Sequence, residues 1–140
     1  MNTIRATVFL LALALSGGCA TVAPEDSDCE GAKLRNITIV YQRHSKITVA
    51  PPRKEVDRGD AINYIVTGTE SRVFKAKGTK APPNSSASFA WLNATGKGGT
   101  ARSGNSHIVC VPVDQEPGIY EYMIEIEDVG TLDPEVHVNR

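Results

Sequence analysis

The chain has no excess of charge of either sign, with 15 Lys+Arg residues against 16 Asp+Glu and a formal net charge of −1. A nucleic-acid-binding protein usually shows a basic footprint, so this balance gives no reason to expect a nucleic-acid partner. The chain also lacks a hydrophobic run long enough to span a bilayer after its first residues. The remaining composition is compatible with one folded domain of modest size.

The one long apolar stretch of the sequence lies close to its N-terminus. "MNTIR" carries one basic residue, and "ATVFLLALALSGG" follows it as a short apolar segment. A basic start followed by an apolar run of about a dozen residues predicts a secretory signal peptide, here residues 1–18, and not a transmembrane helix. We therefore exclude this segment from the fold.

The signal ends in "LSGGCA", where two glycines precede Cys19. This resembles the lipobox of bacterial lipoproteins, although Ser16 stands where that pattern prefers Leu. The resemblance implies that Cys19 is lipidated, for example with palmitate, and becomes the new N-terminus. Residues 19–35 would then form a tether that holds the protein on a membrane of the cell envelope, which we expect to be the periplasmic face of the outer membrane. The alternative is ordinary signal cleavage after Ala20.

Cysteine is scarce, which simplifies its interpretation. Of the three cysteines, Cys19 is lost to lipid or to cleavage, and Cys29 and Cys110 remain in an exported, oxidising setting. An even remainder there predicts a Cys29–Cys110 disulfide. The alternative is a metal-binding thiolate at Cys110, helped by His107 three residues before it.

No helical periodicity longer than a turn or two occurs after residue 35. Short β-branched and aromatic segments alternate there with clusters of Gly, Pro, Asn and Asp, which is typical of strands and turns. We predict an all-β domain over residues 36–140, a Greek-key antiparallel β-sandwich of about eight strands, cupredoxin-like or immunoglobulin-like. The expected strands are 36–42, 46–50, 61–68, 72–77, 88–93, 106–113, 118–127 and 134–139.

The segment "GIYEYMIEIE" shows the clearest alternation. Successive side chains of a strand point to opposite faces of the sheet. Tyr120, Tyr122, Ile124 and Ile126 therefore share one face, which we expect to be the core face. Ile119, Glu121, Met123 and Glu125 share the other.

The order of these segments resembles the cupredoxin family. "ITVAPPRKEVDRGDAINYIV" matches a strand, a loop, a Gly-Asp turn and a second strand. "PGIYEYMIEI" and the closing "LDPEVHV" match the end of the domain. The resemblance implies the scaffold of a blue-copper protein across residues 36–139.

The same resemblance implies that the copper ligands are missing. A blue-copper site needs two imidazoles and a thiolate. The position of the family's thiolate falls on Ile124, and neither "EIEDVGTLDP" nor "TGTESRVFK" contains the expected histidine. We therefore expect no metal site and no cofactor.

The sequence gives little support for catalysis or for phosphate binding. We expect no catalytic residues, since no nucleophile motif is present, and we interpret the Gly-rich residues 95–105 as a hairpin loop and not as a phosphate loop. Trp91 is interpreted as a core residue, with a stacking platform for a glycan or peptide as the alternative. The leading hypothesis is a lipid-anchored, non-enzymatic binding or structural module of the bacterial envelope, with a protein or glycan partner. The alternative is a periplasmic metal carrier or sensor that uses His44, His107, His137 and Met123.

Overall fold

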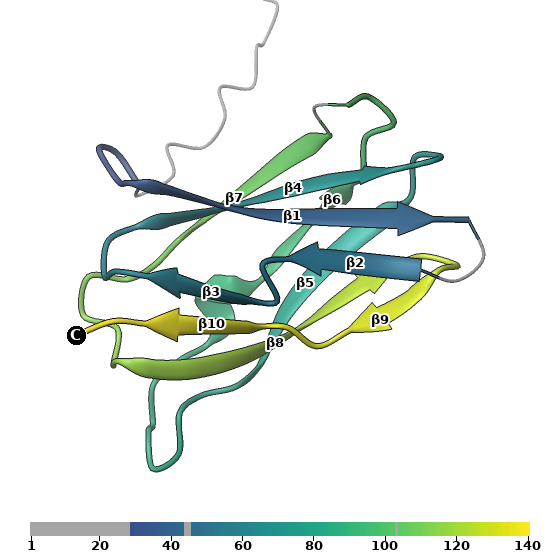
Figure 1. The fold of residues 1–140 in the computed structure, drawn as a ribbon. Coiled ribbons are helices and arrows are strands. Elements are labelled where there is room, and N and C mark those ends of the chain that lie inside the picture. Colours follow the sequence, from purple (N-terminus) through teal and green to yellow (C-terminus); the bar gives the residue numbers. More distant parts are fainter. Residues whose placement is uncertain (1–28, 44–45, 103) are drawn as a thin grey trace, which may run out of the picture.

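The computed structural model describes residues 29–43, 46–102 and 104–140, and these form two packed β-sheets (Figure 1). The four-stranded sheet contains, in spatial order, β2 (Lys46–Ala50), β1 (Leu34–Gln42), β4 (Ala61–Gly68) and β7 (Asn105–Cys110). The six-stranded sheet contains, in spatial order, β3 (Arg53–Val56), β10 (Glu135–Val138), β8 (Gly118–Ile126), β5 (Val73–Lys80) and β6 (Ala94–Lys97). Its sixth strand, β9 (Gly130–Leu132), pairs with the far half of β8. Within these residues no helix is long and apolar enough to cross a membrane.

The expected β-sandwich is confirmed, with two differences. Ten strands are present where about eight were expected, and two of the pairings, β1 with β4 and β3 with β10, are parallel. The parallel pairs arise because the chain changes sheets at Pro51 and Pro52, between β2 and β3. After this crossover the chain returns as β4, which runs beside β1 in the same direction, as parallel neighbours require.

The core lies between the sheets and is formed by alternate residues of each strand. On β8, Tyr120, Tyr122, Ile124 and Ile126 are buried as predicted. From the opposite sheet, β4 contributes Tyr64, whose ring lies 5.7 Å from that of Phe74 and 5.9 Å from that of Tyr122. These tilted aromatic contacts join the two sheets at their centres.

The Gly-Asp turn before β4 joins the start of this strand to β1. Gly59 adopts φ +78°, which a side chain would strain. The buried carboxylate of Asp60 then accepts hydrogen bonds from Arg35 Nε at 2.6 Å and from the Asp57 amide at 2.9 Å. The hydrogen bond that Arg35 donates to Asp60, with the charges of Asp60 and Asp57, raises the pKa of Arg35. This corner sets the register in which β1 and β4 run side by side.

One predicted strand is wrong, and three strands were missed. Residues 88–93 form a loop with one 3-10 turn, η1 (Ala90–Leu92), because the Asn93 side chain accepts the Gly78 amide and thereby holds the loop against β5. A Cβ on Gly78 would overlap the Phe89 carbonyl, so only glycine allows this approach. The missed strands β3, β6 and β9 have three or four residues each and lie in segments that read as turns.

The disulfide between Cys29 and Cys110 is confirmed, with the two Cα atoms 5.4 Å apart. It joins the start of the described body to the end of β7. Because Cys110 pairs with Ala61 on β4, the bridge lies at one end of the four-stranded sheet. The predicted signal peptide, Cys19 and most of the tether lie outside the described residues.

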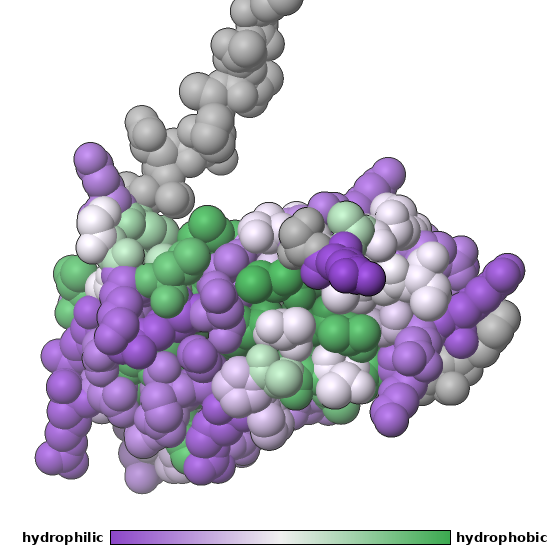
Figure 2. All heavy atoms as spheres, turned by 45° about the horizontal axis from the view of Figure 1, so that its top comes forward, coloured by the Kyte–Doolittle hydropathy of each residue, from purple (hydrophilic) through white to green (hydrophobic). Residues whose placement is uncertain are grey.

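The outward faces of the two sheets differ in charge. On the six-stranded sheet, neighbouring strands carry ion pairs: Lys80 with Glu121, Lys75 with Glu125 and Arg53 with Glu135. On the four-stranded sheet, the outward positions of β1, β4 and β7 hold no charged residue, while β2 carries the outward Lys46. In Figure 2, green and white side chains form a band across the middle of the molecule, interrupted by a purple side chain at its upper margin, with more purple side chains at either end.

We predict that Ile124→Ala lowers the free energy of unfolding by about 2–5 kcal/mol, because it leaves a cavity in the core. Ile124 is fully buried, whereas Ile119 on the same strand is 37% exposed. Ile119→Ala is therefore the matched control, with an expected loss of about 0.5 kcal/mol. Urea unfolding of the purified variants measures both values, and equal losses would contradict the inward orientation of Ile124.

We also predict that Cys29→Ser, Cys110→Ser and the double variant all lose the same stability, about 4 kcal/mol, because each opens the same loop. The bridge joins residues separated by 81 positions. Denaturant unfolding and thiol titration provide the measurement. A double variant clearly less stable than either single variant would show that the two cysteines act separately.

Candidate functional site

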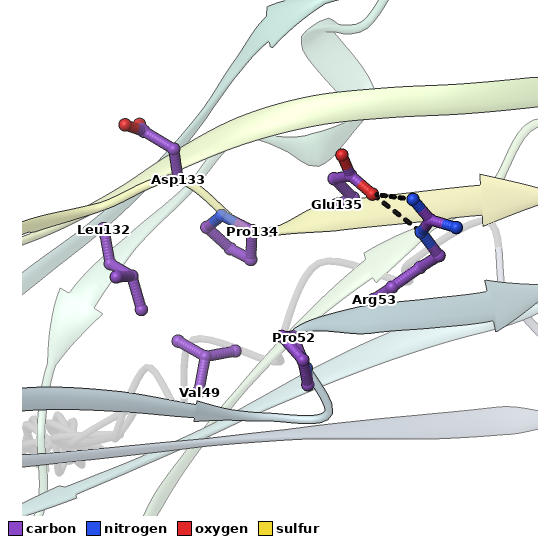
Figure 3. Close-up of a pocket in the computed structure, with 7 residues that line it drawn as sticks. All are labelled: Val49, Pro52, Arg53, Leu132, Asp133, Pro134 and Glu135. Carbon is purple, nitrogen blue, oxygen red and sulfur yellow. Dashed lines mark hydrogen bonds and ion pairs between the residues drawn. The ribbon is translucent and has the colours of Figure 1, made fainter.

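One candidate site is a hollow where β2 and β9 diverge. Next to it β3 and β10 are paired, and the Glu135 amide donates to the Pro52 carbonyl at 3.0 Å. Beyond this point β2 pairs with β1 in one sheet and β9 pairs with β8 in the other. The two segments separate there and leave a space of about 480 Å³ (Figure 3).

The hollow has an apolar floor and a charged end. In Figure 3, the side chains of Val49 and Leu132 point toward each other from the two strands, and Pro134 lies above Pro52. At one end Arg53 donates to Glu135, with Nη2 2.6 Å and Nε 2.7 Å from Oε2. The remaining lining residue is Asp133, so the lining contains no serine, cysteine or histidine. It offers apolar contact, with Asp133 and the Arg53–Glu135 pair as its charged groups.

The walls of the hollow are strand edges. β1 is the only strand that pairs with β2, and β8 is the only one that pairs with β9, among the pairings of the described residues. Each of the two strands therefore has one edge without a strand partner. Such edges can accept an extended peptide, which adds main-chain hydrogen bonds to side-chain burial. Prolines 52 and 134 limit the donors near the closed end, because proline has no N–H.

A second hollow, of about 360 Å³, lies beside Trp91. Its polar groups bond to each other: Gln115 Nε2 donates to the Ser88 carbonyl at 3.1 Å and to the Tyr120 hydroxyl at 2.7 Å. The Tyr120 hydroxyl donates in turn to the Glu116 carbonyl at 2.7 Å. Trp91 is half-buried and meets the Tyr120 ring edge-on, with the centroids 5.6 Å apart. This contact favours the interpretation of Trp91 as a packing residue.

The structure does not bring the described histidines together. His107 points inward, stacks on Phe74 at 5.2 Å and lies 3.1 Å from the Lys97 carbonyl. His137 is on the outward face of β10, with Nδ1 2.8 Å from Glu55 Oε2. Met123 lies outward on β8, and His44 falls outside the described residues. No group of three His, Cys, Asp or Glu residues within the described part of the chain could hold a metal ion.

The metal-thiolate alternative for Cys110 is not supported. Cys110 is bonded to Cys29, and a disulfide sulfur is not a thiolate ligand. His107 and Cys110 also point to opposite faces of β7, because they are three positions apart on a strand. Ile124, the position matched to the family's thiolate, is buried between its strand neighbours Ala76 and Leu132.

The Gly-rich segment is not an anion loop. Its first residues form β6, and the Gly98 and Gly99 amides donate to the carbonyls of Arg72 and Val66 at 2.9 Å each. These amides are already bonded, so they are not free for a phosphate. The segment closes one end of the sandwich.

No family model and no curated protein matches this chain. Solved structures do match. A chain of a heme-copper terminal oxidase dimer shares 10% identity over 79% of this chain and 67% of its own, with a TM-score of 0.41. A copper(I) form of an amicyanin variant shares 16% identity over 81% of this chain and 90% of its own, with a TM-score of 0.42. A multicopper oxidase from the hyperthermophile Aquifex aeolicus shares 14% identity over 79% of this chain and 30% of its own, with a TM-score of 0.38.

Variants of amicyanin are among these neighbours. The fold described above rests on the strand pairing of this chain itself. At such identities and TM-scores the neighbours say nothing about function.

We predict opposite effects for two buried tyrosines on β8. Tyr122 has a buried hydroxyl without a hydrogen-bond partner among the described residues, whereas the Tyr120 hydroxyl has two. Tyr122→Phe should leave the free energy of unfolding unchanged or raise it by about 1–3 kcal/mol, because it removes an unsatisfied polar group. Tyr120→Phe should lower it by about 1 kcal/mol. Equal losses in urea unfolding at pH 7 would contradict these assignments.

Tyr122→Phe should also change how the free energy of unfolding depends on pH in alkaline solution. Burial raises the pKa of Tyr122 above its ordinary value. The unfolded phenol ionises near pH 10 while the folded one stays protonated, so folding is favoured below that pH and loses stability as the pH rises above it. Tyr122→Phe should therefore weaken the loss of stability between pH 10 and 11.

Proposed function

We propose that this chain is a lipid-anchored, non-enzymatic module of the bacterial cell envelope that binds a partner through the hollow between β2 and β9. The arrangement of the N-terminal part supports the anchor. The described body begins at Cys29, which is fastened to β7. Cys19 precedes it by ten residues, a length that reaches at most about 35 Å when extended.

The anchor follows from the sequence before the body. A basic start, a short apolar run and "SGGC" form a signal that ends at a cysteine. One acyl chain binds a membrane only weakly, and two or more hold a protein stably. Lipidation of Cys19 would keep the sandwich within a few tens of ångströms of the membrane, on its periplasmic face.

The binding role is supported by the single observation that two strand edges and an apolar floor meet in one open hollow. Such a site suits an extended segment of an envelope protein that carries an apolar side chain between polar ones. The Arg53–Glu135 ion pair is already satisfied and would form the rim of the contact.

The anchor is tested by expression of the chain with its own N-terminus in a bacterium that is fed labelled palmitate. We expect the wild-type protein to incorporate label and to fractionate with membranes, and Cys19→Ser to lose both properties. Cys29→Ser is the matched control, because it removes a cysteine and the disulfide but leaves Cys19 in place, so it should stay labelled.

An unlabelled wild-type protein in the soluble periplasmic fraction, with an N-terminus beyond Cys19, would overturn the anchor. Such a result would favour cleavage after Ala20.

A further inference from the structure

The three most exposed large apolar side chains of the described residues gather at one end of the sandwich. Val113 is 78% exposed, Leu34 50% and Ile108 49%. Leu34 and Cys110 occupy neighbouring outward positions on either side of β4, and Ile108 lies two positions before Cys110 on the same side of β7. Val113 follows three positions after Cys110. The three side chains therefore lie around the Cys29–Cys110 disulfide, and we call them the bridge patch.

Val113 is held in its place by the loop between β7 and β8. Before it, the Val111 amide donates to the Asp60 carbonyl at 2.9 Å. After it, the buried side chain of Gln115 donates to the Tyr120 hydroxyl at 2.7 Å. The loop is thus fastened to the body two positions before and two positions after Val113. The structure presents this apolar side chain to the outside at a fixed position.

The predicted tether joins the body at the same place. Cys29 is bonded to Cys110, so the preceding chain leaves the body beside the bridge patch. Cys19 lies ten residues before Cys29, which is a reach of at most about 35 Å. With a lipid on Cys19, the membrane surface stays within this reach of the bridge patch. A surface held so close has a high effective concentration, so even a weak contact with it forms.

The charges next to the bridge patch balance. Two exposed cations and two exposed anions lie there: Lys33, Arg58, Glu30 and Asp114. A contact made by the patch therefore depends on its apolar side chains and not on a net charge. The long stems of the two cations allow their charges to stay among lipid headgroups while the apolar side chains go deeper.

The composition of the bridge patch suits lipid better than a protein partner. The residues that contribute most to protein interfaces are mostly Trp, Tyr and Arg, whereas Leu and Val are under-represented among them. The bridge patch contains only aliphatic side chains. Such side chains gain free energy from any apolar surroundings, including acyl chains, and require no specific geometry.

We propose that the bridge patch contacts the membrane that holds the lipid of Cys19, an inference that rests on the anchor proposed above. Its three side chains then lie at the boundary between headgroups and acyl chains. The opposite end of the sandwich, with the turn between β8 and β9, points away from the membrane. In Figure 1, the C-terminus after β10 lies at the left and β9 lies at the right. The hollow between β2 and β9 therefore lies toward the free end, where an envelope protein can reach it.

The test uses the full chain, expressed in a bacterium with its own N-terminus and with a photoreactive phenylalanine analogue at position 113. Position 127 is the matched control, because it is exposed and lies in the turn between β8 and β9 at the opposite end. After irradiation of the cells, the intact mass of the purified protein is measured. We expect position 113 to gain the mass of a phospholipid, and position 127 to give at most about one tenth as much of this product.

A substitution within the bridge patch separates membrane contact from a structural effect. With the photoreactive residue kept at position 113, Leu34→Asp should lower the phospholipid product about fivefold, because a carboxylate resists transfer out of water. Val40→Asp is the matched control. Val40 is an outward residue of the same strand and is 39% exposed, but it lies near the other end of β1. It should leave the product unchanged, and the two variants should have similar urea midpoints.

Vesicles of phosphatidylcholine test the balance of charges. Purified lipidated protein with the photoreactive residue at position 113 should give the same amount of product at low and at high salt, since an apolar contact is not screened. Loss of the product at high salt would overturn the proposal. So would equal yields from positions 113 and 127, equal losses in Leu34→Asp and Val40→Asp, or a product with another protein in place of phospholipid.

Labelled palmitate, measured on the same samples, distinguishes this proposal from the anchor. A labelled protein that gives no phospholipid product at position 113 would overturn the membrane contact and leave the anchor standing. An unlabelled protein would overturn the anchor, and the membrane contact with it.

Discussion

The contact between Tyr64, Phe74 and Tyr122 holds the two sheets together. Tyr64 belongs to β4, an inner strand of one sheet, and Phe74 and Tyr122 belong to β5 and β8, inner strands of the other. All three side chains are fully buried. Because successive side chains of a strand point to opposite faces of the sheet, the inward position of these rings decides which residues of the same strands face water. This arrangement decides that the ion pairs of β3, β5, β8 and β10 lie outward, that the uncharged residues of β1, β4 and β7 also lie outward, and that His107 points inward.

A second constraint comes from the path of the chain between β2 and β3. Pro51 and Pro52 end the pairing with β1, and the chain continues beside β10 in the other sheet. This change of sheet places β1 and β4 in parallel. It also separates β2 from β9 and so creates the hollow, since neither strand can pair with both sheets. The proposed binding site is thus a consequence of how the sandwich closes along one side.

The same architecture leaves no room for a blue-copper centre where the family resemblance would place one. Ile124 fills that position with an aliphatic side chain that packs between two sheet neighbours. The thiol of Cys110 is engaged in a bridge that strengthens the attachment of the N-terminal segment to the four-stranded sheet. Among the described candidates, His107 packs on Phe74, Cys110 forms the disulfide and His137 lies beside Glu55. The chain therefore keeps a scaffold whose interest lies in its surfaces.

The sequence by itself determined the features that depend on local pattern or on counting. The alternation in "GIYEYMIEIE" assigned both faces of β8, and the count of cysteines predicted the bridge between Cys29 and Cys110. Three-residue and four-residue strands could not be predicted, because β3, β6 and β9 are too short to show a period and become strands only beside a partner. The prediction of a strand at 88–93 was wrong because a tertiary contact prevents it: the Asn93 side chain holds the segment as a loop. Only the tertiary structure decided which strands became neighbours. The hollow combines residues that are far apart in sequence, and so does the outward side of β1, β4 and β7. Such surfaces form when the strands bury a shared core, which no single segment encodes.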